Sequence, residues 1–292
     1  MERFVLVFHD QSVALCCPSC VAADMEAIFR DCLSQSARPT RTIVIARNGG
    51  LYSIDDSAGE AVSGLTRVDL PNFVMEFVMR ALIEDIATGV ALHTGAVRWN
   101  GKAILVAGPS GSGKSSMIAW LMDRGFEYLT DEAAVLDSAG MLCCMPRALV
   151  VKPGAAEKVA CFPAFEGAYA VQAGHHSMVR PLKAKSGTGS SPCGLMIFPT
   201  FDRSATLSIE LLAPAQTAMR LVECNLNARN LPDGGFRAIA GLARKAPAVA
   251  LRFGGFEYLE GAADVLARAI PDSGAGPDDC GQFLPGLAAS AA

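Results

Sequence analysis

The pattern of hydrophobic and polar positions predicts an N-terminal part rich in β-strands. Three short apolar runs are bounded by turn residues, at positions 4–8, 42–46 and 51–54. Runs of this length between turn residues are typical of strands. One helix is expected at residues 22–32. Together these elements predict a small α+β lobe over residues 1–70.

A helix that starts at Pro71 is predicted next. Apolar residues recur there at steps of three and four, namely Phe73, Val74, Phe77, Val78, Ala81 and Leu82. This spacing places them on one buried helical face, and a proline suits the first turn. We expect the helix to lead into a larger domain over residues 71–270.

The middle of the chain predicts a strand hairpin followed by a strand–loop–helix unit. Residues 90–99 and 103–107 are apolar and are separated by Asn100-Gly101, a step that accepts the positive φ of a tight turn. A glycine-rich loop follows, and then a helix at residues 115–124 that ends at Gly125. A further strand at 126–129 leads to Asp131-Glu132, which completes an α/β pattern.

The remaining pattern predicts strands at 147–152, 195–198 and 207–212, and a helix at 215–226. Residues 183–192 are rich in Gly, Ser and Lys and are expected to form a mobile loop. Residues 271–292 are rich in Gly, Pro, Ala and Asp, so they are expected to form a disordered tail.

Composition narrows the class of protein. The 292 residues are 51% hydrophobic, enough for a sizeable core. Lys and Arg (25) nearly balance Asp and Glu (29), which argues against nucleic acid or a membrane surface as partner. We expect a cytoplasmic location, because no apolar run reaches the roughly 18 residues of a membrane span and the first residues lack a secretory signal.

The ten cysteines are expected to be free thiols in a reducing compartment. Cys17-Pro-Ser-Cys20, preceded by Cys16, has the spacing of half a metal site. No second pair of this kind and no paired histidine completes a set of four zinc ligands. Structural or incidental roles are therefore favoured over a metal site.

The glycine-rich loop has the spacing Gly-x-x-x-x-Gly-Lys-Ser between Gly108 and Ser115. In this pattern the backbone N–H groups surround a triphosphate, the lysine reaches the β and γ oxygens, and the serine hydroxyl can ligate Mg²⁺. The positive end of the following helix points at the same phosphates. The expected nucleotide-binding residues are Gly108, Pro109, Ser110, Gly111, Ser112, Gly113, Lys114, Ser115 and Ser116.

Carboxylates at the end of the next strand suit the same chemistry. One of Asp131 and Glu132 could hold the magnesium, and the other could orient or deprotonate an attacking hydroxyl. The alternative is that they cap a helix or face solvent. His93 lies in an apolar strand, where a lone histidine is more often structural.

Three basic residues are further candidates for contact with phosphate. Arg180, Arg147 or Lys152 could supply positive charge to a transferring phosphoryl group, although surface arginines usually do not.

From His93 onward the chain resembles the catalytic domain of HPr kinase/phosphorylase and, more closely, the HPr-kinase-related proteins of peptide-modification gene clusters. Residues 92–116 and 124–132 carry the resemblance. His93 lies fifteen residues before Gly108, and Asp131 lies seventeen after Lys114, as in the family pattern. Weaker similarities to the related subfamily occur at 145–152, 179–181 and 197–199.

The resemblance implies a P-loop kinase domain of the HPr kinase C-terminal type, with a mixed sheet and flanking helices. It implies that His93 and Asp131 flank the γ-phosphate, with Asp131 as base toward a serine hydroxyl. Glu132 takes the place of a second family aspartate and, with Ser115, is expected to hold Mg²⁺. Arg180 is expected to join the catalytic set. HPr kinases are hexamers, so the resemblance also implies a homo-oligomer.

The resemblance also narrows the acceptor. The Glu-Ile-Arg-Gly stretch of true HPr kinases does not follow Asp131, and relatives in lasso-peptide clusters phosphorylate a serine of a small ribosomal peptide. The expected function is therefore transfer of the γ-phosphoryl group of ATP to a serine of a peptide or protein. The alternatives are a P-loop NTP hydrolase or switch, and a nucleotide-dependent peptide-binding module without kinase activity.

Overall fold

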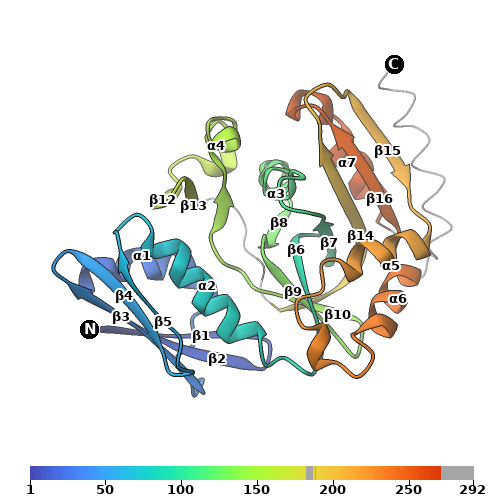
Figure 1. The fold of residues 1–292 in the computed structure, drawn as a ribbon. Helices are drawn as coiled ribbons and strands as arrows, with labels where there is room; N and C mark the ends of the chain where they lie inside the picture. Colours follow the sequence, from blue (N-terminus) through green and yellow to red (C-terminus); the bar gives the residue numbers. More distant parts are fainter. Residues whose placement is uncertain (182–186, 188, 271–292) are drawn as a thin grey trace. The chain divides into compact units, whose positions relative to one another are not determined.

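The computed structural model describes residues 1–181, 187 and 189–270. The predicted disordered tail lies outside these residues, as do positions 183–186 and 188 of the predicted mobile loop. The chain divides into two compact units, drawn in Figure 1. The first comprises residues 1–87 and 145–183, and the second comprises 88–144 and the residues from 184 onward.

The first unit contains a five-stranded sheet in the order β1-β2-β3-β4-β5. Only β2 and β3 are parallel neighbours. The predicted runs at 4–8, 42–46 and 51–54 are confirmed as parts of strands. The bounds are β1 (Glu2–Phe8), β2 (Gln11–Cys17), β3 (Arg41–Asn48), β4 (Leu51–Asp56) and β5 (Ala61–Leu65).

Two helices accompany this sheet. The helix predicted at 22–32 is observed as α1 (Ser19–Phe29), followed by a 3₁₀ turn (Arg30–Cys32). The helix predicted from Pro71 is α2 (Leu70–Ile83), which packs against β2, β3 and β4. This division differs from the boundary predicted at residue 70. The apolar spacing shows which face of α2 is buried, but not which sheet covers it.

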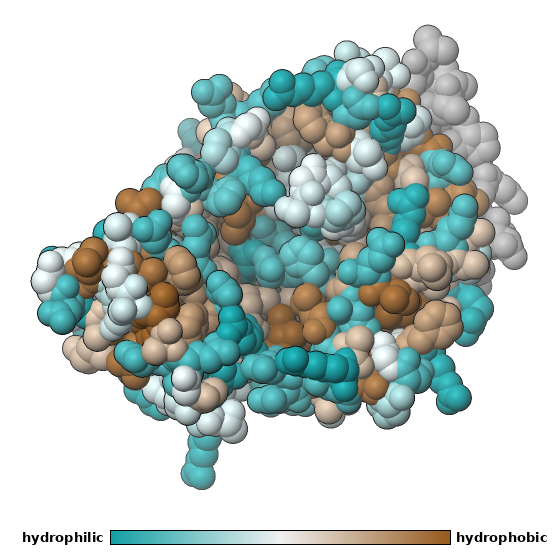
Figure 2. Space-filling model, in the orientation of Figure 1, coloured by the Kyte–Doolittle hydropathy of each residue, from teal (hydrophilic) through white to brown (hydrophobic). Residues whose placement is uncertain are grey.

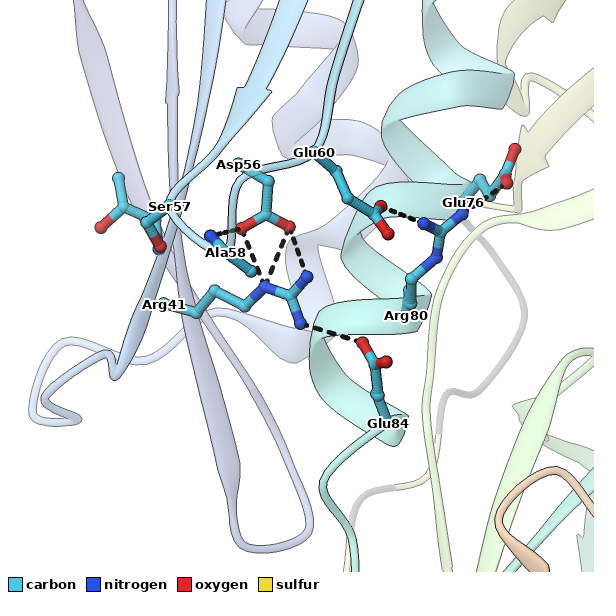
Figure 3. Close-up of polar contacts among 9 residues, drawn as sticks. Arg41, Asp56, Ser57, Ala58, Glu60, Glu76, Arg80 and Glu84 are labelled. Carbon is cyan, nitrogen blue, oxygen red and sulfur yellow. Dashed lines mark hydrogen bonds and ion pairs between the residues drawn. The ribbon is translucent and has the colours of Figure 1, made fainter. Parts of the chain in front are cut away.

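An ion-pair network fixes the end of α2 to the sheet (Figure 3). Arg41 Nε of β3 donates to both carboxylate oxygens of Asp56 at 2.8 and 2.9 Å, and its Nη1 donates to Glu84 at 3.3 Å. The Asp56 side chain is 1% exposed and that of Arg41 is 12% exposed. The hydrogen bond to Asp56 raises the pKa of Arg41. Arg80 of α2 pairs with Glu60, which lies just before β5.

A later segment completes the first unit. The strand predicted at 147–152 is observed as β11 (Leu149–Val151), in a three-stranded sheet with β13 (His176–Arg180) and β12 (Tyr169–Ala173). Helix α4 (Pro153–Ala160) and a 3₁₀ turn (Pro163–Phe165) lie between β11 and β12. Tyr169 Oη donates to Asp24 of α1 at 2.9 Å. Contacts of this kind join residues 145–181 to the N-terminal elements.

The second unit is built on an eight-stranded mixed sheet (Figure 1). Strands β7, β14 and β16 are parallel neighbours, whereas β6 runs antiparallel to β7, β8 and β9. Because β10 pairs with both β9 and β14, the pairings of β9, β6, β7, β14 and β10 close into a ring. The bounds are β6 (Gly89–Trp99), β7 (Lys102–Ala107), β8 (Glu127–Thr130), β9 (Ala133–Asp137), β10 (Met141–Cys144), β14 (Ser190–Phe201), β15 (Leu207–Leu211) and β16 (Ala248–Phe253).

Helices cover this sheet, so the expected mixed α/β class is confirmed. Helix α3 (Lys114–Asp123) packs against β6 and β7. A hydrophobic core joins the sheet to α5 (Pro214–Val222) and α6 (Phe236–Lys245). The last described helix is α7 (Ala262–Arg268). Apolar surface is exposed over α5 and α6, where Met219, Val222 and Phe236 are 66, 41 and 53% exposed (Figure 2).

Two local predictions differ in outcome. The hairpin at Asn100-Gly101 is confirmed, with φ of 48° and 76° between β6 and β7. The helix predicted at 215–226 ends early, because α5 stops at Val222. The residues that follow it bond to β6 instead.

Candidate functional site

The glycine-rich loop joins the buried strand β7 to helix α3. Gly108, Gly111 and Gly113 have φ of 149°, 86° and 99°, a region that side chains rarely adopt. A Cβ at Gly113 would also lie 3.1 Å from the ring of Phe253. The sequence therefore needs glycine here to turn from strand to helix. The nine predicted nucleotide-binding residues lie in this loop and in the first turn of α3.

Lys114 is folded against the loop that precedes it. Its side chain is largely buried, and Nζ donates to the carbonyl oxygens of Gly108 at 2.8 Å and Pro109 at 3.1 Å. These are neutral acceptors. Phosphate oxygens are charged acceptors that form stronger bonds with an ammonium group. A triphosphate in the loop could therefore take their place.

Ser112 contributes a buried hydroxyl to the same loop. Within the part of the chain that the structure describes, its Oγ has no hydrogen-bond partner. This oxygen would lie 3.1 Å from a Cβ at Gly108, so it borders the start of the loop. A buried polar atom without a partner costs about 1–3 kcal/mol. An oxyanion in the loop would satisfy this donor.

His93 of β6 and Glu132 of the turn between β8 and β9 form a pair. Nδ1 of His93 lies 3.3 Å from Oε1 of Glu132, and the two side chains are 37% and 28% exposed. The carbonyl of Glu132 accepts the N–H of Thr94 at 3.1 Å. Thr130 Oγ1 accepts the N–H of Glu132 at 3.1 Å, which fixes the turn between β8 and β9. The pair is thus partly accessible, and Glu132 is held in place through its carbonyl and its N–H.

Asp131 is buried beside this pair. It is 3% exposed, and Oδ1 accepts a hydrogen bond from Tyr128 Oη at 3.3 Å. Sequence analysis did not identify Tyr128 as a partner, although it lies only three residues earlier. The tyrosine gives the carboxylate a fixed orientation.

The glycine-rich loop and the His93–Glu132 pair both lie at the C-terminal end of β7, beside the middle of β6. Alternate residues of a strand share a face, so His93 lies on the face of Gly95. A Cβ at Gly95 would lie 2.8 Å from Ile118 of α3, so this is the face that α3 covers. Lys114 is one turn before Ile118, and β7 runs antiparallel to β6 with Ala107 opposite Thr94. Lys114 and the end of β7 at Ala107 are therefore both displaced from Gly95 and Ile118 toward His93.

The separation across the sheet follows from strand geometry. Glu132 bonds to one edge of β6 through Thr94, and Ala107 pairs with the other edge. Two strand spacings of about 4.8 Å place their backbones about 10 Å apart. A triphosphate in the loop, together with the substrate side chain that would receive its terminal phosphoryl group, could fit across this distance.

A segment that sequence analysis assigned to a helix completes the edge of β6. The carbonyl of Cys224 accepts the N–H of His93 at 2.7 Å, and the N–H of Leu226 donates to Ala91 at 2.8 Å. The side chain of Asn227 accepts from the N–H of Ala91 at 2.8 Å and donates to Gly89 at 2.9 Å. Two asparagines within three residues were the available signal that the helix ends before this segment.

The other basic candidates belong to the first unit. Arg180 pairs with Asp31 at 2.7 Å. Arg147 is 2% exposed and donates to the carbonyl of Ala148 at 2.7 Å. Lys152 is exposed at the start of α4. Their contacts with a phosphoryl group stay predictions.

The N-terminal cysteines lie in and after β2. Burial raises the pKa of Cys17 to about 11, and the Sγ of Cys20 lies 3.8 Å from Tyr52 Oη. Among the described residues, no group of three or more His, Cys, Asp or Glu side chains could hold a metal ion.

No protein-family model matches this chain, and no curated protein matches it. Of the helices in the described ranges, none is both long and apolar enough to cross a membrane.

Proposed function

We propose that the chain is an ATP-dependent kinase, with a P-loop kinase domain similar to that of HPr kinases, that phosphorylates a serine of a peptide or protein. One observation carries the proposal. Lys114 is folded against the carbonyls of the glycine-rich loop at the C-terminal end of β7, on the sheet face that also carries His93 of the His93–Glu132 pair. Asp131 adjoins that pair in the chain.

The loop supplies the donors that a triphosphate needs. Its backbone N–H groups and the N-terminus of α3 favour negative charge, and Lys114 adds a full positive charge. The buried Oγ of Ser112 adds a further donor without a competing partner among the described residues. ATP would bind with its β and γ oxygens near Lys114.

The predicted magnesium ligands fit the preference of that ion. Ser115 and Glu132 offer a hydroxyl and a carboxylate oxygen, and both are partly exposed. Magnesium is commonly held by one or two protein oxygens together with substrate phosphates, so a larger cluster of ligands is not required. When bound, the ion would neutralise charge on the phosphates.

The transfer itself needs a base and an oriented acceptor. Asp131 accepts the proton of the serine hydroxyl while the hydroxyl oxygen forms a bond to the γ-phosphorus. The bond from that phosphorus to the bridging oxygen breaks, and ADP leaves. Tyr128 orients Asp131. Glu132 holds the His93 ring beside the γ-phosphoryl group. The acceptor serine therefore approaches side chains that are fixed in position.

The direct test is transfer of label from ATP. Wild-type protein and Asp131→Asn are incubated with γ-labelled ATP, Mg²⁺ and a panel of serine peptides, each with a matched Ser→Ala peptide. We expect label on serine peptides only, lowered about 100-fold or more in Asp131→Asn, with ATP affinity retained. Transfer at the wild-type rate in Asp131→Asn would remove it as base.

The same assay separates the alternatives. Release of labelled phosphate without transfer to any peptide would favour an NTP hydrolase or switch. ATP binding without any turnover would favour a nucleotide-dependent binding module. A homo-oligomer, a cytoplasmic location and the absence of nucleic acid or membrane partners stay predictions.

A further inference from the structure

The edge of β6 is shared by two segments that meet beside the phosphate loop. β7 occupies it along residues 94–99, with Ala107 opposite Thr94. Residues 224–227 occupy it along 89–93, with Cys224 on His93. Cys224 therefore takes the position that directly follows Ala107 along this edge. This is the point at which the chain leaves the sheet at Gly108.

The thiol of Cys224 borders the loop. The residue is 7% exposed and belongs to the core between the sheet, α5 and α6. Its Sγ donates to the carbonyl of Arg220 at 3.5 Å. Burial raises the pKa of this thiol, while the backbone N–H of Gly108 and the charge of Lys114 lower it. A thiol sulfur is a weak hydrogen-bond acceptor. It can hold a backbone N–H in place without competing strongly with phosphate.

A second polar group lies at the same place, namely the hydroxyl of Ser112. It is buried, it has no partner among the described residues, and it too borders Gly108. Gly108 is therefore bordered by the Cys224 sulfur and by the Ser112 hydroxyl, a donor without a partner among the described residues.

We propose that Cys224 is a positioning residue for the nucleotide. Its carbonyl accepts the N–H of His93, and its thiol borders Gly108, where the glycine-rich loop begins, so that one residue positions both the histidine and the start of the loop. ATP binding and the closed arrangement of residues 224–227 are then coupled. The inference rests on the proposed function, because it concerns the same loop.

This coupling has a measurable consequence for thiol chemistry. A reagent reaches a thiol that is 7% exposed only when the segment opens. A ligand that binds only the closed segment lowers the fraction of open molecules by a factor that grows with the ratio of ligand concentration to Kd. Nucleotide should therefore slow modification of Cys224. A partly buried thiol elsewhere in the unit, that of Cys193, should be unaffected.

Wild-type protein provides the first test. It is treated with iodoacetamide, with and without MgATP, and alkylation of each cysteine is followed by mass spectrometry. The reaction forms an S–C bond with loss of iodide and a proton. At ATP near 100 times Kd we expect alkylation of Cys224 to slow about tenfold or more, with Cys193 unchanged. ATP binding is measured in parallel by equilibrium dialysis.

Variants provide the second test. We expect Cys224→Ala to weaken ATP binding about fivefold or more, and Cys224→Ser to restore most of it, because a hydroxyl can also accept from Gly108. Cys193→Ala is the control for general loss of packing, which lowers stability without changing ATP affinity.

The outcomes are distinct. Bound ATP without protection of Cys224 would overturn the inference, as would unchanged affinity in a folded Cys224→Ala. If wild-type protein binds no ATP, the proposed function fails and this inference fails with it. If Cys224→Ala does not fold, the protection of Cys224 from alkylation by MgATP in the wild type tests the inference on its own.

Discussion

Nδ1 of His93 lies 3.3 Å from Oε1 of Glu132, the N–H of His93 donates to Cys224, and the carbonyl of Glu132 accepts from Thr94 of β6. If Glu132 orients the histidine during transfer, the two side chains act as a unit. We expect His93→Gln and Glu132→Gln each to lower kcat for phosphoryl transfer about 10- to 100-fold. The double variant should lose little more than either single one, because effects within a unit are not additive. Independent, multiplicative losses would contradict the pairing.

We predict that loss of the Arg41–Asp56 pair lowers the stability of the protein strongly and leaves its affinity for nucleotide unchanged. Asp56 is nearly fully buried, so its removal leaves the largely buried Arg41 with only the longer contact to the more exposed Glu84. We expect Asp56→Ala to lower the free energy of unfolding by about 3 kcal/mol, measured by urea denaturation. Glu76→Ala is the matched control, because this exposed carboxylate pairs with Arg80 on the surface. A similar small loss in both would contradict a structural role for the buried pair.

Asn227 predicts a local effect beside the site. Its side chain is 1% exposed and makes two bonds to the backbone of β6. Asn227→Ala would leave buried backbone groups without partners, at a cost of about 2–3 kcal/mol. Hydrogen exchange should speed up at Ala91, whose N–H bonds to this side chain. Unchanged exchange at Ala91 would contradict the assignment.

Cys193 predicts a dependence of stability on alkaline pH. Burial raises its pKa from 9.0 to about 12. A raised pKa stabilises the fold fully below pH 9, and this contribution is lost as pH rises toward 12. Between pH 8 and 10, in the presence of reductant, the wild type should therefore lose about 1 kcal/mol more than Cys193→Ala. Urea denaturation measures the free energy of unfolding of both proteins. Equal losses between pH 8 and 10 in the wild type and Cys193→Ala would contradict a raised pKa of this thiol in the folded state.

Local signals in the sequence predicted the elements closest to the chemistry. The turn at Asn100-Gly101 and the glycines at 108 and 113 require positive φ, and few other residues adopt it. The strand, loop and helix from Lys102 to Asp123 could therefore be placed within a residue or two.

Pairing between distant segments could not be predicted in the same way. β14 lies between β7 and β16, and these partners are far apart in sequence. Register is set by packing across strands, which a single sequence does not encode locally. For the same reason the sheet that covers α2 and the return of Cys224 to β6 were missed.

The central claim is that the glycine loop and Lys114 bind a triphosphate. Titration of MgATP into wild-type protein and Lys114→Met in a calorimeter tests it most directly. We predict saturable binding by the wild type and an affinity about tenfold or more lower in the variant, because a charge-assisted hydrogen bond is lost. No binding by the wild type, or equal binding by both proteins, would contradict it.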